Sequence, residues 1–210
     1  MSSVREFDVR GDVSSEHVVQ LFDETESLIA SVSSYLLDGW KRGDNILIAA
    51  RPAHWAMASA ELASDGCPVV DLVAAGRLVA LDAATTLATF MVGNDPQPEK
   101  FHATVGDLVA RLASMPGTGL TIYGEMVDIL TAHDNFPAAQ RLEALWNDLA
   151  ERYPFRLLCG YSAAHFGDER MARQLAAVCA AHTGCSARPT DLLATWLLSN
   201  RRSRFHIEQQ

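Results

Sequence analysis

The chain contains few cysteines, and their arrangement matches neither a disulfide framework nor a redox motif. Its 210 residues include only Cys67, Cys159, Cys179 and Cys185, and no two of them form CxxC. Small secreted proteins that depend on disulfides have a much higher cysteine content. We therefore expect reduced thiols and a cytoplasmic protein.

The chain also lacks segments that would take it into a membrane, and it has few basic residues. No apolar run approaches the roughly 20 residues that a membrane-spanning helix needs. Residues 1–16 are polar and charged, unlike a signal peptide, and we expect them to form a flexible lead. Lysine and arginine total 17 against 26 acidic residues, a net charge of −9. Because such a surface repels phosphate backbones, we expect no direct nucleic-acid partner.

Sequence motifs for phosphate binding, catalysis and metal binding are absent as well. The patterns GxxxxGK[ST], GxGxxG and GxSxG occur nowhere in the chain. Neither HxxxH nor HExxH occurs, so no single element fixes two metal ligands. We therefore expect no catalytic residues, no metal site and no cofactor, although His17, Cys159 and His182 could converge from the ends of their elements.

Hydrophobic residues instead recur at the spacings of alternating helices and strands. Leu28, Ile29, Val32, Tyr35 and Leu36 fall on one helix face, and a continuous apolar strand follows. Further strands are predicted at 17–22, 46–50, 78–81, 120–123 and 155–161, with helices at 52–64, 83–91, 101–112, 137–149 and 168–181. Residues 69–73 fit a strand or a helical turn, and 93–98 fit a loop. This alternation predicts an α/β fold of three layers, with a mostly parallel sheet and helices on both faces.

Residues 183–210 differ in character from the rest and are predicted to form a C-terminal helical extension. Leu192, Leu193, Trp196 and Leu197 form an apolar stripe there. One interpretation is a last helix that packs on the domain. The other is a contact with a partner or a second copy of the chain, made by Leu193, Trp196 and Leu197.

The turn after the first strand is acidic where nucleotide-binding proteins carry lysine. Asp23, Glu24 and Glu26 stand in the position that cradles phosphate in a P-loop protein. Carboxylates there repel a triphosphate. The turn is either an acidic helix start exposed to water or the rim of a ligand pocket that includes Phe22 and Asp23.

Further candidate ligand-binding residues lie where predicted strands end. Glu125 follows the strand at 120–123, and ligands of open α/β sheets bind at the carboxyl ends of strands. The alternative for Glu125 is a helix N-terminal acid. Cys159 and Tyr161 also lie at a strand end, and Cys159 is either a ligand contact or a small buried hydrophobe.

Three polar residues complete the set of candidates. His17 begins the first strand, and His182 lies on the apolar face of its helix, where a hydrogen-bonded core histidine is the alternative. Glu143 is next to the inward face that Leu142 helps to define. If it points inward it needs a partner, either an arginine such as Arg77 or Arg156, or a ligand. Surface exposure is the alternative.

Several of these segments together resemble one known family. They are Tyr35–Asp44 followed by Ile46–Ala50, Gly66, Gly76–Leu78, Ile122–Met126, Glu143 with Trp146–Asn147, and Leu157–Tyr161. In order and spacing they resemble the MEDS domain, a sensory domain of methanogens and methylotrophs found in a dichloromethane-responsive repressor and in some histidine kinases. The resemblance covers about residues 17–182.

The resemblance implies a RecA/KaiC-like fold without a working P-loop and a role in sensing small molecules such as hydrocarbon derivatives. We therefore expect residues 17–182 to be a non-catalytic sensory domain with a ligand in a degenerate nucleotide cleft. The expected partner is a regulatory protein such as a histidine kinase or a transcription regulator, contacted in trans. The alternatives are a divergent NTPase and a ligand-free interaction module.

Overall fold

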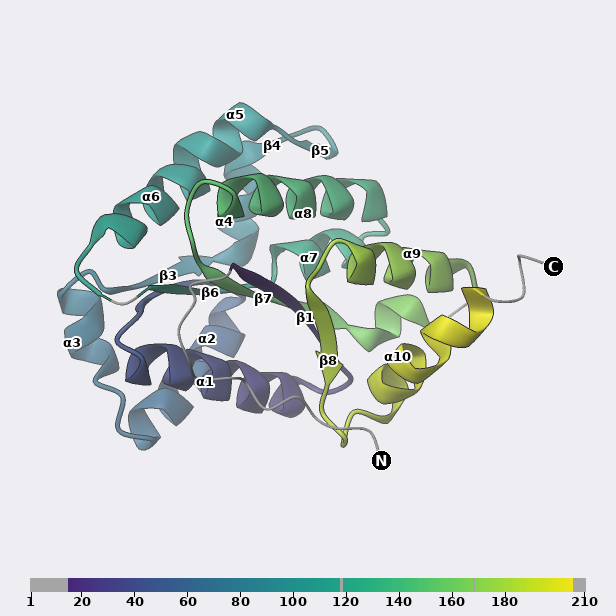
Figure 1. Ribbon diagram of the computed structural model, residues 1–210, viewed down its shortest axis with the longest axis horizontal. Coiled ribbons are helices and arrows are strands. Elements are labelled where there is room, and N and C mark those ends of the chain that lie inside the picture. The colour runs from purple at the N-terminus through teal and green to yellow at the C-terminus, as the bar shows by residue number, and fades with distance from the viewer. Residues whose placement is uncertain (1–14, 118, 168, 206–210) are drawn as a thin grey trace.

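The computed structural model describes residues 15–117, 119–167 and 169–205 and is built around one parallel sheet (Figure 1). This six-stranded sheet has the order β3-β2-β6-β7-β1-β8, and all its pairings are parallel. Its strands are β3 (Leu78–Asp82), β2 (Asn45–Ala50), β6 (Leu120–Gly124), β7 (Arg156–Ser162), β1 (Glu16–Phe22) and β8 (Gly184–Ala187). Helices cover both faces, so the predicted three-layer α/β fold, with its RecA-like arrangement, is confirmed.

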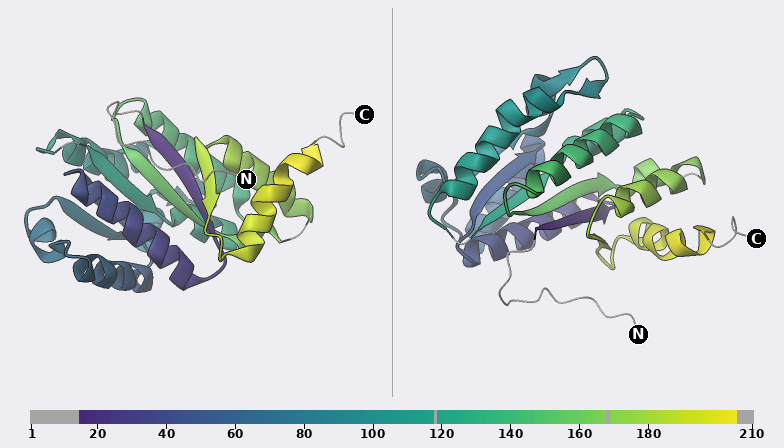
Figure 2. Two further views of the ribbon diagram at one scale, coloured as in Figure 1. Left: turned by 60° about the horizontal axis from the view of Figure 1, so that its bottom comes forward. Right: turned by 45° about the horizontal axis from the view of Figure 1, so that its top comes forward.

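The two helical layers differ in size, as the views in Figures 1 and 2 show. One face carries α1 (Thr25–Lys41), α2 (Pro52–Ser64) and α3 (Val69–Ala74). The other carries α4 (Ala83–Phe90), α5 (Pro98–Phe101), the π-helical turn η1 (His102–Gly106), α6 (Asp107–Ser114), α7 (Met126–Ala132), α8 (Phe136–Ala150) and α9 (Glu169–Ala180). The short 3₁₀ helix η2 (Ala163–Phe166) and α10 (Leu192–Phe205) lie at the β8 end of the sheet.

The alternation of side chains along each strand divides the interior into two hydrophobic cores. In β2, Ile46 and Ile48 pack toward α1 and α2, whereas Leu47 and Ala49 belong to the core on the opposite face. Successive residues of a strand point to opposite faces, and every residue of β2 is buried. A continuous apolar run is therefore what this central position requires.

Residues 69–74 form the helix α3, which settles the choice between a strand and a helical turn. The structure departs from the sequence-based expectations elsewhere. A small antiparallel hairpin pairs β4 (Met91–Val92), at the expected end of a helix, with β5 (Asp95–Pro96), inside the expected loop. The edge strand β8 was not anticipated; it pairs with β1. Residues 1–14 of the expected flexible lead lie outside the described residues, while Glu16 begins β1.

Polar residues lie at both ends of the strands of the parallel sheet. The turns that follow β1, β2, β6 and β7 all lie at the carboxyl ends of the strands, and these turns contain Arg51, Glu125 and Asp23. His17 lies near the amino end of β1, in register with Leu157 of β7. Among the described helices, none combines the length and the apolar character needed to cross a bilayer.

Candidate functional site

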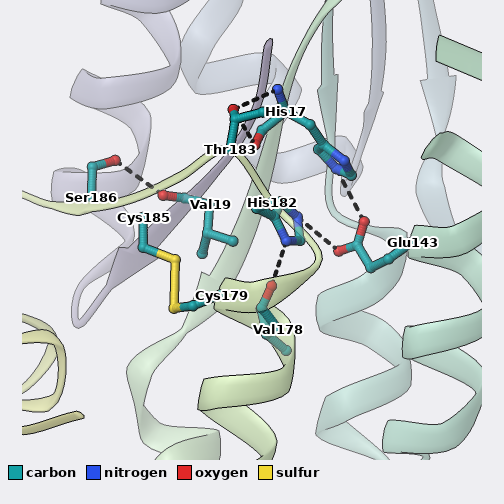
Figure 3. Close-up of a disulfide and its surroundings, with 9 residues drawn as sticks. All are labelled: His17, Val19, Glu143, Val178, Cys179, His182, Thr183, Cys185 and Ser186. Carbon is teal, nitrogen blue, oxygen red and sulfur yellow. Dashed lines mark hydrogen bonds and ion pairs between the residues drawn. A yellow bond between two sulfur atoms is a disulfide. The ribbon is translucent and has the colours of Figure 1, made fainter. Parts of the chain in front are cut away.

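Four potential ligand side chains from different elements meet in the core between the sheet, α8 and α9, and Figure 3 draws His17, Glu143 and His182 among them. They are His17 on β1, Glu143 on α8, Cys159 on β7 and His182, which follows α9; we call them the histidine cluster. One donor atom from each lies within 4.8 Å of all the others. His17 Nε2 is 3.1 Å from Glu143 Oε2 and 3.3 Å from Cys159 Sγ, while His182 Nε2 is 3.2 Å from Glu143 Oε1.

Surrounding groups fix the orientation of both imidazoles. His17 Nδ1 is 2.8 Å from Asn147 Oδ1, and the Asn147 amide nitrogen donates to the Ala181 carbonyl at 3.1 Å. His182 Nδ1 is 2.6 Å from the Val178 carbonyl oxygen. Each ring therefore turns Nδ1 toward the surrounding protein and Nε2 into the cluster.

Glu143 carries a negative charge in the histidine cluster. Burial alone would raise the pKa of Glu143, but His182 and His17 outweigh this effect and hold that pKa far below its usual range. Burial would lower the pKa of His182, yet the Glu143 carboxylate raises it. The hydroxyl of Tyr161 also donates to Glu143 Oε1 at 2.6 Å. Burial, followed by Glu143, raises the pKa of Cys159, so this thiol is not poised as a nucleophile.

A disulfide joins Cys179 and Cys185 beside this cluster, which corrects the expectation that all thiols are reduced (Figure 3). The two Cα atoms are 6.0 Å apart. The pairing arises because the chain turns back after α9 to enter β8, and this turn contains His182. Cys67 and Cys159 are free and buried.

A second buried network lies at the carboxyl ends of β2 and β6. Glu125 is 0% exposed and accepts hydrogen bonds from Arg51 Nη1 at 2.8 Å and from the Arg51 backbone N–H at 3.3 Å. It also accepts from His54 Nδ1 at 2.9 Å and from the Tyr123 hydroxyl at 3.0 Å. We call these residues, together with Asp128, the arginine network.

Asp128 extends the arginine network toward β7 and η2. It lies 2.6 Å from Arg51 Nη2 and 3.1 Å from His165 Nε2, and it accepts a hydrogen bond from the Ser162 N–H at 2.7 Å. Burial would raise the pKa of Asp128, but His165, the Ser162 amide and Arg51 together lower it. The Asp128 carboxylate is therefore stabilised in its charged form.

An apolar crevice adjoins the arginine network between α1, α2 and the sheet. We call it the α1–α2 crevice; it is lined by Ile29, Val32, Leu36, Ile48, Ala50, His54, Trp55, Ala58 and Tyr123. The space between these side chains amounts to about 180 Å³ including its mouth, and it is too narrow to admit a water molecule. His54 and Tyr123 form its polar end and connect it to Glu125.

The turn between β1 and α1 holds a carboxylate of the same chain. The buried Asp191 accepts from the Ser27 hydroxyl at 2.5 Å and from the Asp23 N–H at 3.3 Å. Asp23 in return accepts from the N–H groups of Leu193 at 2.8 Å and Ala194 at 2.9 Å. Asp23 therefore satisfies backbone donors at the start of α10, as an N-terminal cap does.

The predicted ligand-binding residues thus separate into three places. His17, Glu143, Cys159, Tyr161 and His182 lie together, with Glu143 paired to histidines and not to Arg77 or Arg156. Glu125 belongs to the arginine network, and Phe22 and Asp23 lie at the β1–α1 turn.

The residues predicted to contact a partner also separate. Trp196 is 49% exposed and Leu193 is 38% exposed, whereas Leu197 is only 7% exposed and packs into the core. The exposed Leu192 lies beside Leu193 at the start of α10.

Sequence reasoning missed several polar residues that complete these sites, namely Arg51, His54, Asp128, Asn147 and Asp191. For Arg51 a local signal was present, because it directly follows the predicted strand of residues 46–50 and precedes Pro52. Asp128 follows Glu125 by one helical turn, which places both near the same strand end. Asp191 has no such signal, since its partners are more than 160 positions away.

These features define a class: a three-layer, parallel α/β domain whose first strand-to-helix turn carries carboxylates and no phosphate-binding motif. The family described as MEDS, MEthanogen/methylotroph, DcmR Sensory domain, matches residues 16–183. The chain belongs to this family of sensory domains, as the resemblance implied.

Two further comparisons concern curated proteins and solved structures. No curated protein matches the chain. Among solved structures it is similar to Thermomonospora curvata EccC (ATPases 2 and 3) in complex with a signal sequence peptide, with 12% identity and a TM-score of 0.38. The similarity covers 85% of this chain and 31% of that one, so the chain spans under a third of that protein's length.

Proposed function

We propose that the chain is a non-catalytic sensory domain of the cytoplasm that binds a small, mostly apolar molecule in the α1–α2 crevice. Membership of a sensory-domain family supports a signalling role. The observation that carries the choice of ligand is the lining of the crevice, where His54 and Tyr123 are the polar side chains among aliphatic ones and Trp55. Burying apolar ligand surface there contributes about 25 cal/mol per Å². A hydrocarbon derivative with one polar group has this chemistry.

The polar end of the crevice favours recognition over proton transfer. Glu125 already accepts hydrogen bonds from Arg51, His54 and Tyr123. The carboxylate oxygens of Glu125 are therefore already occupied by neighbouring groups of the chain. A ligand that accepts a hydrogen bond from His54 or Tyr123 would compete with Glu125 and so change the contacts of Arg51.

Helix α1 offers a route from the crevice to the surface. Its C-terminal end packs directly on β6, because a Cβ atom at Gly39 would lie 2.6 Å from Thr121 Oγ1. Its N-terminal end is tied to α10, because Ser27 donates to Asp191 and Asp23 caps α10. A ligand that displaces the α1 wall would therefore move its Ser27 end, and with it α10.

In this proposal residues 17–182 sense the ligand and residues 183–210 transmit the signal. Leu193 and Trp196 are exposed on α10 and supply an apolar contact for a regulatory protein, such as a histidine kinase or a transcription regulator. A second copy of the chain is the alternative partner for this surface. The net charge of −9 argues against direct contact with nucleic acid.

A ligand-free interaction module is the second candidate function. The observation in its favour is that the side chains of the α1–α2 crevice leave no space for a water molecule. In that case the crevice is a packed part of the core, and α10 alone carries the function.

Thermal unfolding with a panel of halogenated, methylated and short-chain hydrocarbon compounds tests the proposal. A compound at 100 times its dissociation constant stabilises the folded state by about 2.7 kcal/mol. Mg·ATP belongs in the panel as the test of a divergent NTPase, and we expect no stabilisation because Asp23 and Asp191 occupy the β1–α1 turn. If no compound in the panel raises the unfolding temperature, the sensor proposal is contradicted, and the ligand-free interaction module becomes the favoured function.

A matched pair of substitutions on α2 locates the binding site. Ala58 is buried in the crevice wall, whereas Ala60 is exposed on the same helix. Ala58→Val fills the crevice and should abolish stabilisation by the compound, while Ala60→Val should leave it unchanged. Equal responses of both variants would place the ligand elsewhere.

A further inference from the structure

The histidine cluster presents lone pairs that face one another. The Val178 carbonyl can only accept, so Nδ1 of His182 carries a proton. The Ala181 carbonyl accepts from the Asn147 amide nitrogen, so Oδ1 of Asn147 faces His17, and Nδ1 of His17 is protonated as well. In the neutral form, which has one N–H, each imidazole therefore has its lone pair on Nε2, inside the cluster.

His182 Nε2 is buried and forms no hydrogen bond with the described part of the chain. The side chain is 0% exposed, and this nitrogen lies 3.2 Å from Glu143 Oε1 without forming an aligned hydrogen bond. Leaving a buried polar atom without a partner costs about 1–3 kcal/mol. Two acceptors at this distance are stabilised by a cation between them, which is either a proton or a metal ion.

The donor set and its spacing favour a metal ion. Imidazole nitrogen, thiolate sulfur and carboxylate oxygen are the ligands that Zn²⁺ takes in proteins, at bonds of about 2.0–2.3 Å. Tetrahedral geometry with such bonds separates neighbouring donor atoms by about 3.3–3.8 Å. Three of the observed separations are 3.1 Å from His17 Nε2 to Glu143, 3.3 Å from His17 Nε2 to Cys159, and 3.7 Å from Cys159 Sγ to Glu143 Oε2. All four donor atoms lie within 4.8 Å of one another, so small shifts of side chains would bring them onto one ion.

We propose that the histidine cluster binds one divalent transition-metal ion, with Zn²⁺ as the best match. Its ligands are Nε2 of His17, Nε2 of His182, Sγ of Cys159 and a carboxylate oxygen of Glu143. On binding, the Cys159 thiol and any imidazolium release their protons to solvent. The thiolate and the carboxylate then balance the ion's two positive charges, so no net charge is left in the core.

This metal site is separate from the α1–α2 crevice and does not depend on the proposed function. Its four protein ligands form a closed shell, which is typical of an ion that stabilises or reports on a fold and not of one that activates water. Because His17 lies on β1, Cys159 on β7, Glu143 on α8 and His182 just after α9, the ion connects four parts of the fold. We therefore expect it to stabilise the packing of α8 and α9 on the sheet.

Metal titration of the full chain tests this proposal. The chain is stripped with a chelator and kept free of thiol reductant, so that the Cys179–Cys185 disulfide stays intact, and is then titrated with Zn²⁺ or Co²⁺. We expect one equivalent to bind and to raise the unfolding temperature. Co²⁺ should show a thiolate-to-cobalt charge-transfer band together with the ligand-field bands of a tetrahedral ion. Absence of stoichiometric binding, or a cobalt spectrum without the thiolate band, would overturn the proposal.

Two cysteine variants identify the sulfur ligand. Cys159→Ser should lose the charge-transfer band and bind Zn²⁺ more weakly. Cys67→Ser is the matched control, because Cys67 is also a free, buried cysteine but packs in the other core. A band that persists in Cys159→Ser, or that disappears in Cys67→Ser, would contradict the assignment.

A change outside the ligand shell keeps the test decisive if Cys159→Ser does not fold. Asn147 is only partly buried and orients His17 through Nδ1. Asn147→Ala should weaken Zn²⁺ binding about 10–100-fold while retaining the thiolate band, as losing an outer-shell partner does. Unchanged affinity in this variant would show that His17 is not a ligand.

Discussion

Glu125 and Glu143 are both buried in the described part of the chain, and they are held by different kinds of partner. Glu125 is paired with the guanidinium of Arg51, which stays protonated at all physiological pH values. Glu143 is paired with His17 and His182, and a histidine side chain can either carry a proton or bind a metal ion. Arginine makes a permanent ion pair, whereas histidine makes a site in which the cation can change. Similar burial of the same residue type therefore leads to different chemistry.

The largest expected effect comes from removing each glutamate. Glu125→Ala leaves Arg51 without one of its buried carboxylates and should lower the free energy of unfolding by about 3–5 kcal/mol, with Zn²⁺ or with chelator. Glu143→Ala should also destabilise the domain, but the difference between Zn²⁺ and chelator should largely disappear. Urea unfolding in both conditions measures these effects.

The exposed Glu61 on α2 supplies the control for these two variants. Glu61→Ala should change the free energy of unfolding by less than about 0.5 kcal/mol. The comparison fails if Glu125→Ala loses the difference in stability between Zn²⁺ and chelator that the wild type shows, or if Glu143→Ala keeps that difference in full.

A pair of tyrosines gives the next largest effect and a sharper comparison. Tyr123 and Tyr161 are both buried, and each donates its hydroxyl to one of the two glutamates, at 3.0 Å and 2.6 Å. Replacing either by phenylalanine removes a hydrogen bond to a charged acceptor and should cost about 1.5–3 kcal/mol. Only Tyr161→Phe should also weaken Zn²⁺ binding, by about 10–100-fold. Competition with a chromophoric chelator measures this difference, and a change of affinity in Tyr123→Phe would contradict it.

Asp23 is a half-buried carboxylate that is stabilised by backbone N–H groups, with neither arginine nor histidine as a partner among the described residues. It accepts hydrogen bonds from the backbone at the start of α10. Asp23→Ala should cost about 0.5–2 kcal/mol, the usual effect of losing a helix cap, and should speed hydrogen exchange at the Leu193 and Ala194 amides. The exposed Glu24→Ala is the control and should change neither. Unchanged exchange in Asp23→Ala would argue against the coupling of α1 to α10.

The smallest expected effect is a change of pH dependence in the arginine network. The pKa of Asp128 in the folded state is lower than its ordinary value of 3.8. Its contribution to stability is therefore complete above that value and is lost as the pH falls through the folded pKa. The variant Asp128→Asn lacks this contribution, so its free energy of unfolding should fall less on acidification than that of the wild type. Urea unfolding between neutral pH and pH 3 measures it, and parallel curves for both proteins would contradict the assignment.

Periodicity alone predicted most of the fold. The apolar run of β2 and the helical spacing in α1 are local patterns, and both elements lie where those patterns place them. The edge strand β8 escaped prediction because it has only four residues, is partly exposed and contains no branched aliphatic side chain. Its strand conformation depends on pairing with β1, which is not visible in its own sequence.

The candidate sites could be predicted only in part, because their partners are distant in sequence. The sequence showed that His17, Cys159 and His182 could converge from the ends of their elements, and the structure brings them together, although no metal site was expected. For Glu143 the sequence left an inward position and surface exposure open, and the inward partners considered were arginines or a ligand, whereas the structure pairs it with two histidines. The disulfide and the contacts of Asp191 depend on how α9, β8 and α10 return to β1, which no local pattern specifies.

The disulfide between Cys179 and Cys185 has a consequence for the imidazole of His182, which lies inside the small covalent ring that the bond closes. While the ring is closed, His182 cannot follow an unwinding of the last turn of α9. Opening it removes that restraint without changing any ligand. A thiol reductant should therefore act on the position of a ring nitrogen as well as on two sulfur atoms, and the same chain should hold a metal ion less firmly in reducing surroundings than in oxidising ones.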